Sequence, residues 1–130
     1  MKPCPCGSGR IFIKCCKPYI TGKMRPLTAE ALMRSRYSAY TRGNIGYIQK
    51  TMREKALEGF DPADATNWAQ MVTWLGLKVV QTQNGQATDE YGTVEFIATY
   101  RHNGQIMTLH ECSEFNKQAG IWYYVGGRHQ

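Results

Sequence analysis

Four of the five cysteines of this chain lie within thirteen positions, in the stretch CPCGSGRIFIKCC. They are Cys4, Cys6, Cys15 and Cys16, and thiolates are good ligands for zinc and for iron–sulfur clusters. Four thiolates around one zinc ion make a closed tetrahedral site, with no position left for water or substrate. The spacing therefore predicts one structural Zn2+ ion, with an iron–sulfur cluster or metal-free cysteines as the alternatives.

The length and the N-terminal residues of the chain restrict its class. A chain of 130 residues is the size of one ordinary domain and can bury a core without crosslinks. It opens with Met1-Lys2-Pro3-Cys4, with no apolar run behind the charge, and no window reaches the length of a membrane-spanning helix. We expect a cytoplasmic protein without a membrane partner. Thiols stay reduced in that compartment, which favours a metal site over disulfides.

Positive charge is concentrated in the segment that holds the cysteines. Residues 1–26 contain six basic and no acidic residues, whereas residues 27–130 contain ten of each sign. A basic, metal-clamped segment can dock on an acidic protein or on RNA phosphate, such as that of the ribosome. The alternative is that these lysines only solubilise the segment and offset its thiolates. We expect no sequence-specific DNA binding.

Helix signals dominate the part of the chain between the cysteine segment and residue 74. The sequence predicts helices over residues 28–43, 44–52 and 61–74, with Thr28, Asn44 and Asp61 as their N-terminal caps. Pro62 suits the first turn of the third helix, and Gly43 suits the end of the first.

Strand signals follow residue 74, because apolar residues there recur at every second position. The sequence predicts strands at residues 75–83, 92–101, 106–115 and 121–127, joined in part by the hairpin dipeptides Asn84-Gly85 and Asn103-Gly104. The expected fold is therefore α+β, with three helices followed by a four-stranded antiparallel meander. A two-residue turn at 103–104 pairs Phe96 with Glu111 and Val94 with Ser113. The predicted core face carries Glu111 and seven apolar or aromatic residues, among them Met107, and is extended across the last hairpin by Trp122 and Tyr124.

Two charged residues are predicted on the inner faces of these elements. The register turns Glu111 inward, and Arg36 lies on a helix stripe that also contains residues 33, 37 and 40. We predict an ion pair between Arg36 and Glu111, with Arg34 as the alternative partner. The pair is either purely structural or part of the polar floor of a site for a small acid or amide. That floor would consist of Arg36, Tyr37, Tyr40, Glu111 and Ser113.

The segment from Cys4 to Cys16 resembles the SEC-C motif, a small zinc-binding element also found at the C-terminus of the translocase motor SecA. Beyond it, TAEALMRSRYSAYTRG, GTVEFIATYR, LHECSEF and IWYYVGG resemble the bacterial YchJ family over nearly the whole chain. The resemblance implies a SEC-C element at residues 1–22, with the four cysteines as zinc ligands. It also implies a nuclear-transport-factor-two-like domain at residues 23–130, in which helices and a curved sheet form a cone.

Two functions fit these observations, and the first is the predicted function, with the second as the alternative. In the first, the chain is a zinc-binding interaction module whose basic N-terminal segment binds a protein or the ribosome. In the second, the cone binds a small ligand or acts as an enzyme, and the zinc is purely structural. No nucleophile with a spaced histidine and acid is present, so no catalytic residue is assigned. An open cavity beside Glu111 would favour the second function.

Overall fold

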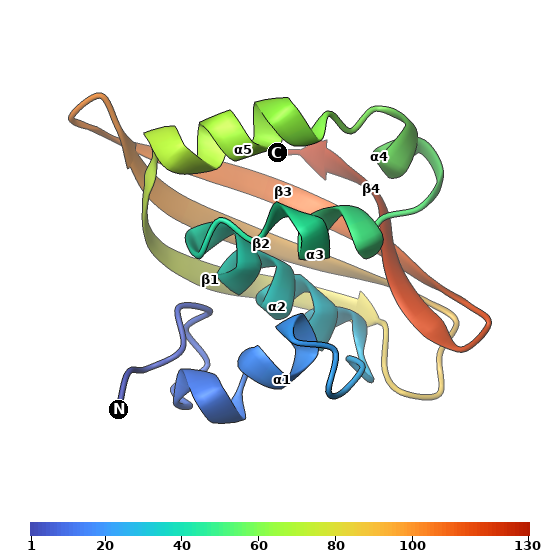
Figure 1. The fold of residues 1–130 in the computed structure, drawn as a ribbon. Coiled ribbons are helices and arrows are strands. Elements are labelled where there is room, and N and C mark those ends of the chain that lie inside the picture. Colours follow the sequence, from blue (N-terminus) through green and yellow to red (C-terminus); the bar gives the residue numbers. More distant parts are fainter.

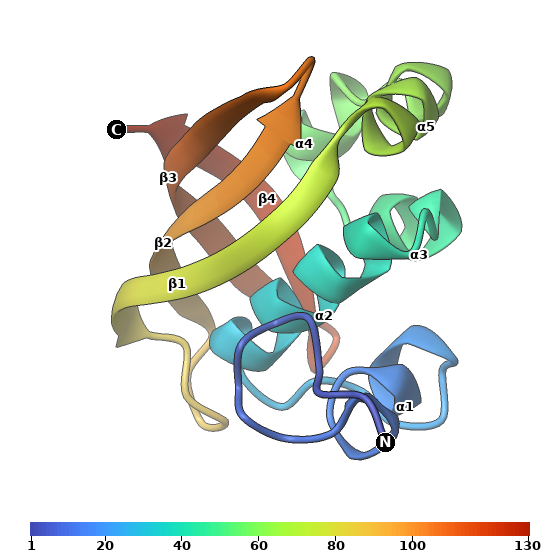
Figure 2. The same cartoon turned by 90° about the vertical axis from the view of Figure 1, so that its left-hand side faces the viewer.

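A computed structural model describes all residues, 1–130, as a four-stranded sheet with helices packed on one face (Figures 1 and 2). The elements, in chain order, are η1 (Phe12–Lys14), α1 (Lys17–Ile20), α2 (Ala29–Thr41), α3 (Ile45–Lys50), α4 (Glu54–Glu58), α5 (Pro62–Met71), β1 (Thr73–Asn84), β2 (Tyr91–His102), β3 (Gln105–Gln118) and β4 (Ile121–His129). The expected α+β class, with helices before a meander, is confirmed. None of the helices combines the length and the apolar character needed to span a membrane.

The three predicted helices begin at their predicted caps. The Thr28 side chain accepts a hydrogen bond from the Ala31 amide at 3.0 Å, and Asn44 accepts one from Tyr47 at 3.0 Å. Asp61 does the same for the first turn of α5. Each cap satisfies an amide that has no partner inside its helix.

The third helix is shorter than predicted, because α5 ends at Met71 and Trp74 belongs to β1. Val72 already has an extended backbone, and Thr73 pairs with Arg101 of β2. The β-branched pair at residues 72–73 favours the strand. The short helices α1 and α4 are additional to the three predicted ones.

The sheet is an antiparallel meander in the order β1-β2-β3-β4. The predicted register of β2 and β3 is confirmed, including the pairs Phe96 with Glu111 and Val94 with Ser113. Asn103 and Gly104 form the predicted two-residue turn with positive φ at both positions. The Asn84-Gly85 dipeptide also has positive φ, but it opens a longer connection that reaches β2 at Tyr91.

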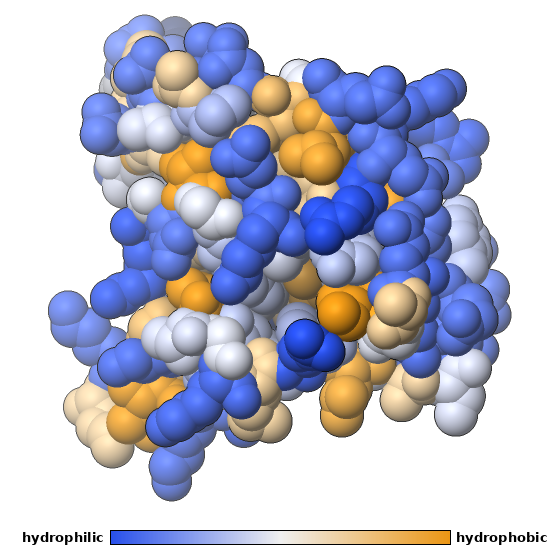
Figure 3. All heavy atoms as spheres, turned by 45° about the vertical axis from the view of Figure 1, so that its right-hand side comes forward, coloured by the Kyte–Doolittle hydropathy of each residue, from blue (hydrophilic) through white to orange (hydrophobic).

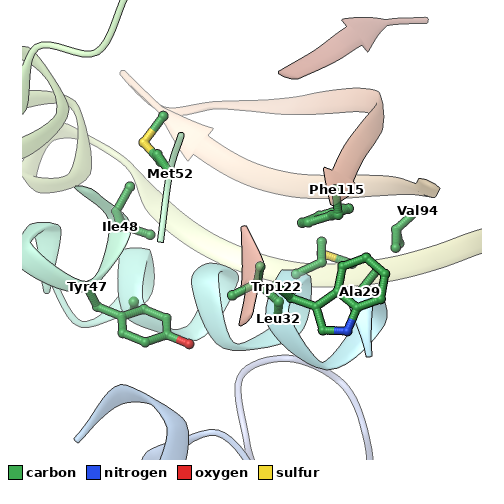
Figure 4. Packing of buried hydrophobic residues seen from close by; sticks show 10 residues of the cluster. Ala29, Leu32, Tyr47, Ile48, Met52, Val94, Phe115 and Trp122 are labelled. Carbon is green, nitrogen blue, oxygen red and sulfur yellow. The ribbon is translucent and has the colours of Figure 1, made fainter. Parts of the chain in front are cut away.

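The main core lies between α2, α3 and the sheet (Figure 4). Its ten buried residues are Ala29, Leu32, Met33, Ala39, Tyr47, Ile48, Met52, Val94, Phe115 and Trp122. The segment after α3 is tied to β4, because the Tyr124 amide donates to Thr51 O at 2.9 Å and the Arg53 amide donates to Tyr124 O at 3.0 Å. This link brings the residues after α3 next to the concave face of the sheet.

Met107, which was predicted on the core face, is 41% exposed. The β2–β3 hairpin extends beyond the helices in Figure 1, so its tip residues have no layer to pack against. Its neighbour Ile106 is exposed as well. On the face shown in Figure 3, apolar side chains form separate patches among polar and charged ones.

Candidate functional site

The four clustered cysteines meet at one point in the structure. All four are free thiols, and their sulfur atoms lie within 4.8 Å of one another. The Cys6–Cys15 and Cys15–Cys16 sulfur distances are 3.7 and 4.0 Å. A tetrahedral zinc site with Zn–S bonds of about 2.3 Å has sulfur–sulfur edges of about 3.8 Å. The sulfur atoms therefore fit the coordination sphere of one tetrahedral metal ion.

Short local hydrogen bonds fold the segment so that the cysteines converge. The Cys4 amide donates to Arg10 O at 2.8 Å, and the Cys15 amide donates to Phe12 O at 3.0 Å. Gly7 has a φ of 78°, a conformation that glycine adopts without strain, and this turns the chain directly after Cys6. The sequence thus shapes the site by turns rather than by long elements.

Hydroxyl groups and an arginine surround the sulfur atoms. Ser8 Oγ lies 3.1 Å from Cys15 Sγ, and Ser38 Oγ of α2 lies 3.4 Å from Cys4 Sγ. Arg34 donates to Cys6 O at 2.6 Å and pairs with Glu30 at 2.9 Å. Arg34 is therefore engaged beside the cysteines and is not the partner of Glu111. Outer contacts of this kind orient metal ligands.

The thiols perturb one another strongly. Hydrogen bonding from Cys16 lowers the pKa of the Cys6 thiol to about 4. The hydrogen bond to Cys6, together with burial, raises the pKa of Cys16. Opposite pKa shifts of this kind are expected when thiols crowd together, because one is ionised and accepts a hydrogen bond from the other. Metal binding would displace the remaining proton.

The cysteine segment packs firmly on the rest of the chain. Cys4, Cys6 and Phe12 belong to a buried cluster that also contains Tyr37 of α2 and Ala98 of β2. A Cβ atom on Gly7 would lie 3.1 Å from Leu77 O, so the loop contacts β1 closely. Both ribbon views place the segment against α2 (Figures 1 and 2). The candidate metal centre therefore supports the same elements that enclose the interior cavity.

That cavity has a volume of about 240 Å³ and lies between α2, α5 and the concave face of the sheet. Eleven of its fourteen lining residues are hydrophobic. The lining includes all five residues that the sequence suggested for a ligand site, Arg36, Tyr37, Tyr40, Glu111 and Ser113. The structure thus brings these five side chains to a common space; whether they bind a ligand stays a prediction.

Glu111 forms one polar wall of the cavity. Its Oε2 atom accepts hydrogen bonds from Ser113 Oγ at 2.6 Å and from the Tyr124 hydroxyl at 3.0 Å. Gly127 of β4 leaves room for this carboxylate, because a Cβ atom there would lie 2.7 Å from Glu111 Cδ. The carboxylate is therefore held by two donors on one side, with a glycine making space for it.

Arg36 forms the other polar wall, and the predicted ion pair with Glu111 is wrong. Its Nη1 atom donates to Ile48 O at 2.8 Å and to Thr51 Oγ1 at 2.7 Å, and no carboxylate oxygen lies within 4.0 Å. The guanidinium lies 4.5 Å from the centre of the Tyr124 ring. Both acceptors lie at the C-terminal end of α3, which is hydrogen-bonded to β4. The pattern of predicted helices and strands does not reveal this contact between distant segments. Burial lowers the pKa of Arg36.

Aromatic rings enclose the opposite end of the cavity. Trp68 of α5 and Trp74 of β1 lie 5.1 Å apart, measured between ring centres, and Tyr37 lies 5.4 Å from Trp74. Trp68 also contacts Tyr40 at 6.4 Å. The buried Nε1 of Trp74 has no hydrogen-bond partner. From the sequence, these tryptophans were predicted only as core residues. Trp74 was predicted to lie in a helix, so its position in the sheet was not foreseen.

Known proteins share this fold over nearly the whole chain. A family model described as YchJ, middle NTF2-like domain, matches residues 28–127. The chain is 47% identical to a UPF0225 protein of Geobacter sulfurreducens, over 95% of this chain and 77% of that protein. It is 36% identical to a SEC-C motif containing protein from Rhodopseudomonas palustris, with a TM-score of 0.87 over 96% of each chain.

A second solved structure, a SEC-C motif containing protein from Psychrobacter arcticus, is 30% identical with a TM-score of 0.80, over 95% of this chain and 80% of that one. The chain therefore belongs to the YchJ family. The resemblance found in the sequence is confirmed. The cysteine cluster is compatible with metal binding, as the SEC-C motif of both structural relatives suggests.

Proposed function

We propose that Cys4, Cys6, Cys15 and Cys16 hold one structural zinc ion. The support is the tetrahedral spacing of four sulfur atoms and their burial against α2. Because all four positions would be filled by protein thiolates, bound zinc would stabilise the segment without offering a site to substrate. A cavity of about 220 Å³ reaches Cys15 and Cys16 and gives the metal a path to the sulfur atoms.

The function that the geometry supports best is the binding of a small, mostly apolar molecule in the cavity lined by Arg36 and Glu111. The observation that carries this proposal is a cavity of about 240 Å³, partly open to solvent, whose lining is apolar except for a few polar groups. Ligand sites commonly combine an apolar lining with a small number of placed polar groups.

The volume limits the size of such a ligand. An apolar cavity of about 150 Å³ accommodates benzene, so a cavity of about 240 Å³ has room for one ring with a short substituent. A molecule with two fused rings would fill it. Drug-sized ligands need pockets of about 300 Å³ or more, so part of such a molecule would lie outside this cavity.

Filling the cavity tests this function. Leu109 lines the cavity, and Leu109→Trp should occupy it, whereas Leu75 is 44% exposed on β1 and serves as the control in Leu75→Trp. We expect indole to bind the native protein and the control, detected by ligand-observed NMR, and to lose binding in Leu109→Trp. Equal binding by all three folded proteins would place the indole site elsewhere and reject the cavity.

A second candidate function is the docking of an acidic partner, such as the ribosome, on the cysteine segment. The observation that favours it is that all six basic residues of residues 1–26 are exposed: Lys2, Arg10, Lys14, Lys17, Lys23 and Arg25. Cosedimentation with ribosomes should weaken in a Lys14→Glu/Lys17→Glu variant and at raised salt. Cosedimentation that is unchanged by both would rule out this mode of docking.

A further inference from the structure

The polar end of the cavity leaves hydrogen-bonding groups without protein partners. Every side-chain hydrogen bond of Arg36 comes from Nη1, so its Nε and Nη2 groups donate to no protein atom. Arg36 is 8% exposed, and no carboxylate lies within 4.0 Å of it. These N–H groups are not sealed off, because the fully buried side-chain atoms without a partner are Trp74 Nε1 and His102 Nε2. Water therefore reaches the free N–H groups of Arg36, and a ligand acceptor would take the place of that water.

Glu111 has one carboxylate oxygen that no protein group donates to. Ser113 and Tyr124 both donate to Oε2, and Oε1 accepts no hydrogen bond from the protein. Tyr124 separates the two charged groups, since its hydroxyl bonds Glu111 and its ring lies against Arg36. The cavity therefore offers unused donors on one wall and an unused charged acceptor on the other.

These two walls discriminate among possible head groups. A carboxylate would satisfy Arg36 but would be repelled by Glu111, and an ammonium group would meet the reverse problem. A neutral group with an acceptor and an N–H donor side by side satisfies both walls. Carboxamides and lactams, including the amide-like edges of heterocyclic bases, have this arrangement.

The other end of the cavity selects the body of the ligand. Trp68, Trp74 and Tyr40 meet edge to face or tilted, with ring centres 5.1 to 6.4 Å apart. Aromatic faces and edges at this spacing favour a flat ring as their neighbour. The cavity volume admits one or two fused rings, as described above.

Building on the proposed ligand-binding function, we propose that the cavity binds a small aromatic carboxamide or lactam. Its carbonyl oxygen accepts from Arg36, its N–H donates to Glu111 Oε1, and its ring lies among Trp68, Trp74 and Tyr40. The ligand is neutral, because the two walls carry opposite charges.

The experiment compares four probes that share one benzene ring and one attached carbon: benzamide, benzoate, benzylammonium and toluene. Dissociation constants are measured by NMR titration on the zinc-loaded full chain, its Glu111→Gln variant and a Glu95→Gln control. Glutamine keeps an oxygen for Ser113 and Tyr124, and Glu95 is bonded to His110 and lies outside the cavity lining. The control therefore makes the same charge change at another place.

We expect the native protein and Glu95→Gln to prefer benzamide over both charged probes by about tenfold or more, the scale of one charge-assisted hydrogen bond. In Glu111→Gln, benzoate should gain about tenfold relative to benzylammonium, because the positive charge of Arg36 is no longer opposed. Equal affinities for all probes, or an unchanged ratio of benzoate to benzylammonium affinity in Glu111→Gln, would overturn the assignment of ligand class while toluene binding still supports the cavity. If no probe binds, toluene included, the proposed ligand-binding function itself fails.

Discussion

The glycines at positions 126 and 127 of β4 offer a matched test of how Glu111 is positioned. Neither has a positive φ, so an alanine is allowed by the backbone at both. A Cβ atom on Gly126 meets nothing within 4 Å, whereas one on Gly127 would lie 2.7 Å from Glu111 Cδ and 2.9 Å from the Tyr124 hydroxyl. Gly127→Ala should therefore expel the carboxylate from its place.

The expected cost follows from the bonds that are lost. Glu111 accepts two hydrogen bonds, and bonds to a charged group contribute about 1.5–3 kcal/mol each. The displaced carboxylate can recover part of this by turning into the cavity, so we expect Gly127→Ala to lower the free energy of unfolding by about 2–4 kcal/mol. Gly126→Ala should change it by about 1 kcal/mol or less, in either direction.

Urea unfolding at neutral pH measures the difference. With a slope of about 2 kcal/mol per molar urea, the middle of the usual range, Gly127→Ala should lower the midpoint by about 1–2 M relative to Gly126→Ala. In a Glu111→Ala background the difference between the two substitutions should shrink, because the carboxylate that collides with Cβ is gone and only the contact with the Tyr124 hydroxyl remains. Equal midpoints of the two variants in the native background would refute this account of Glu111.

Three further outcomes are expected. Cys16→Ser should lower the amount of zinc retained after dialysis, whereas Cys112→Ser should leave one zinc per chain, since Cys112 lies outside the cluster; equal zinc contents would remove Cys16 from the site. Chelation should abolish amide-exchange protection at Phe12 while Phe115, in the other core, stays protected; simultaneous loss at both would show one cooperative unit. Burial raises the pKa of Tyr47 to about 12, so the unfolded state releases this proton first and stability should fall by about 2–3 kcal/mol as pH rises from about 10 to 12. Tyr47→Phe should flatten that part of the pH profile, and an unchanged slope would contradict the assignment.

The parts of the fold that were predictable from the sequence depend on local signals. Helix caps act within three residues, as Thr28 and Asn44 show, so the starts of α2 and α3 were readable. The turn at Asn103-Gly104 fixed the pairing of β2 with β3, and the alternation of side chains then turned Glu111 toward the helices. The clustering of the cysteines was readable for the same reason, since all four lie close in sequence.

What could not be predicted depends on contacts between distant segments. Arg36 is held by Ile48 O and Thr51, and their position follows from the pairing of Thr51 with Tyr124 across 73 residues. No periodic pattern carries that information, so the apolar stripe suggested an ion pair instead. The prediction of helix at Trp74 was wrong for a different reason. Helix and strand signals compete at residues 72–74, and pairing with β2 decides in favour of the strand.

The central claim is that this YchJ-family chain binds a small molecule in its cavity and uses its cysteines for a structural zinc. Native mass spectrometry of the protein purified from its own cells tests this claim most directly. The account predicts one zinc per chain plus a small-molecule mass that Glu111→Gln loses while its zinc is retained. A protein that carries zinc alone and instead co-purifies with ribosomes through its basic N-terminal residues would contradict it.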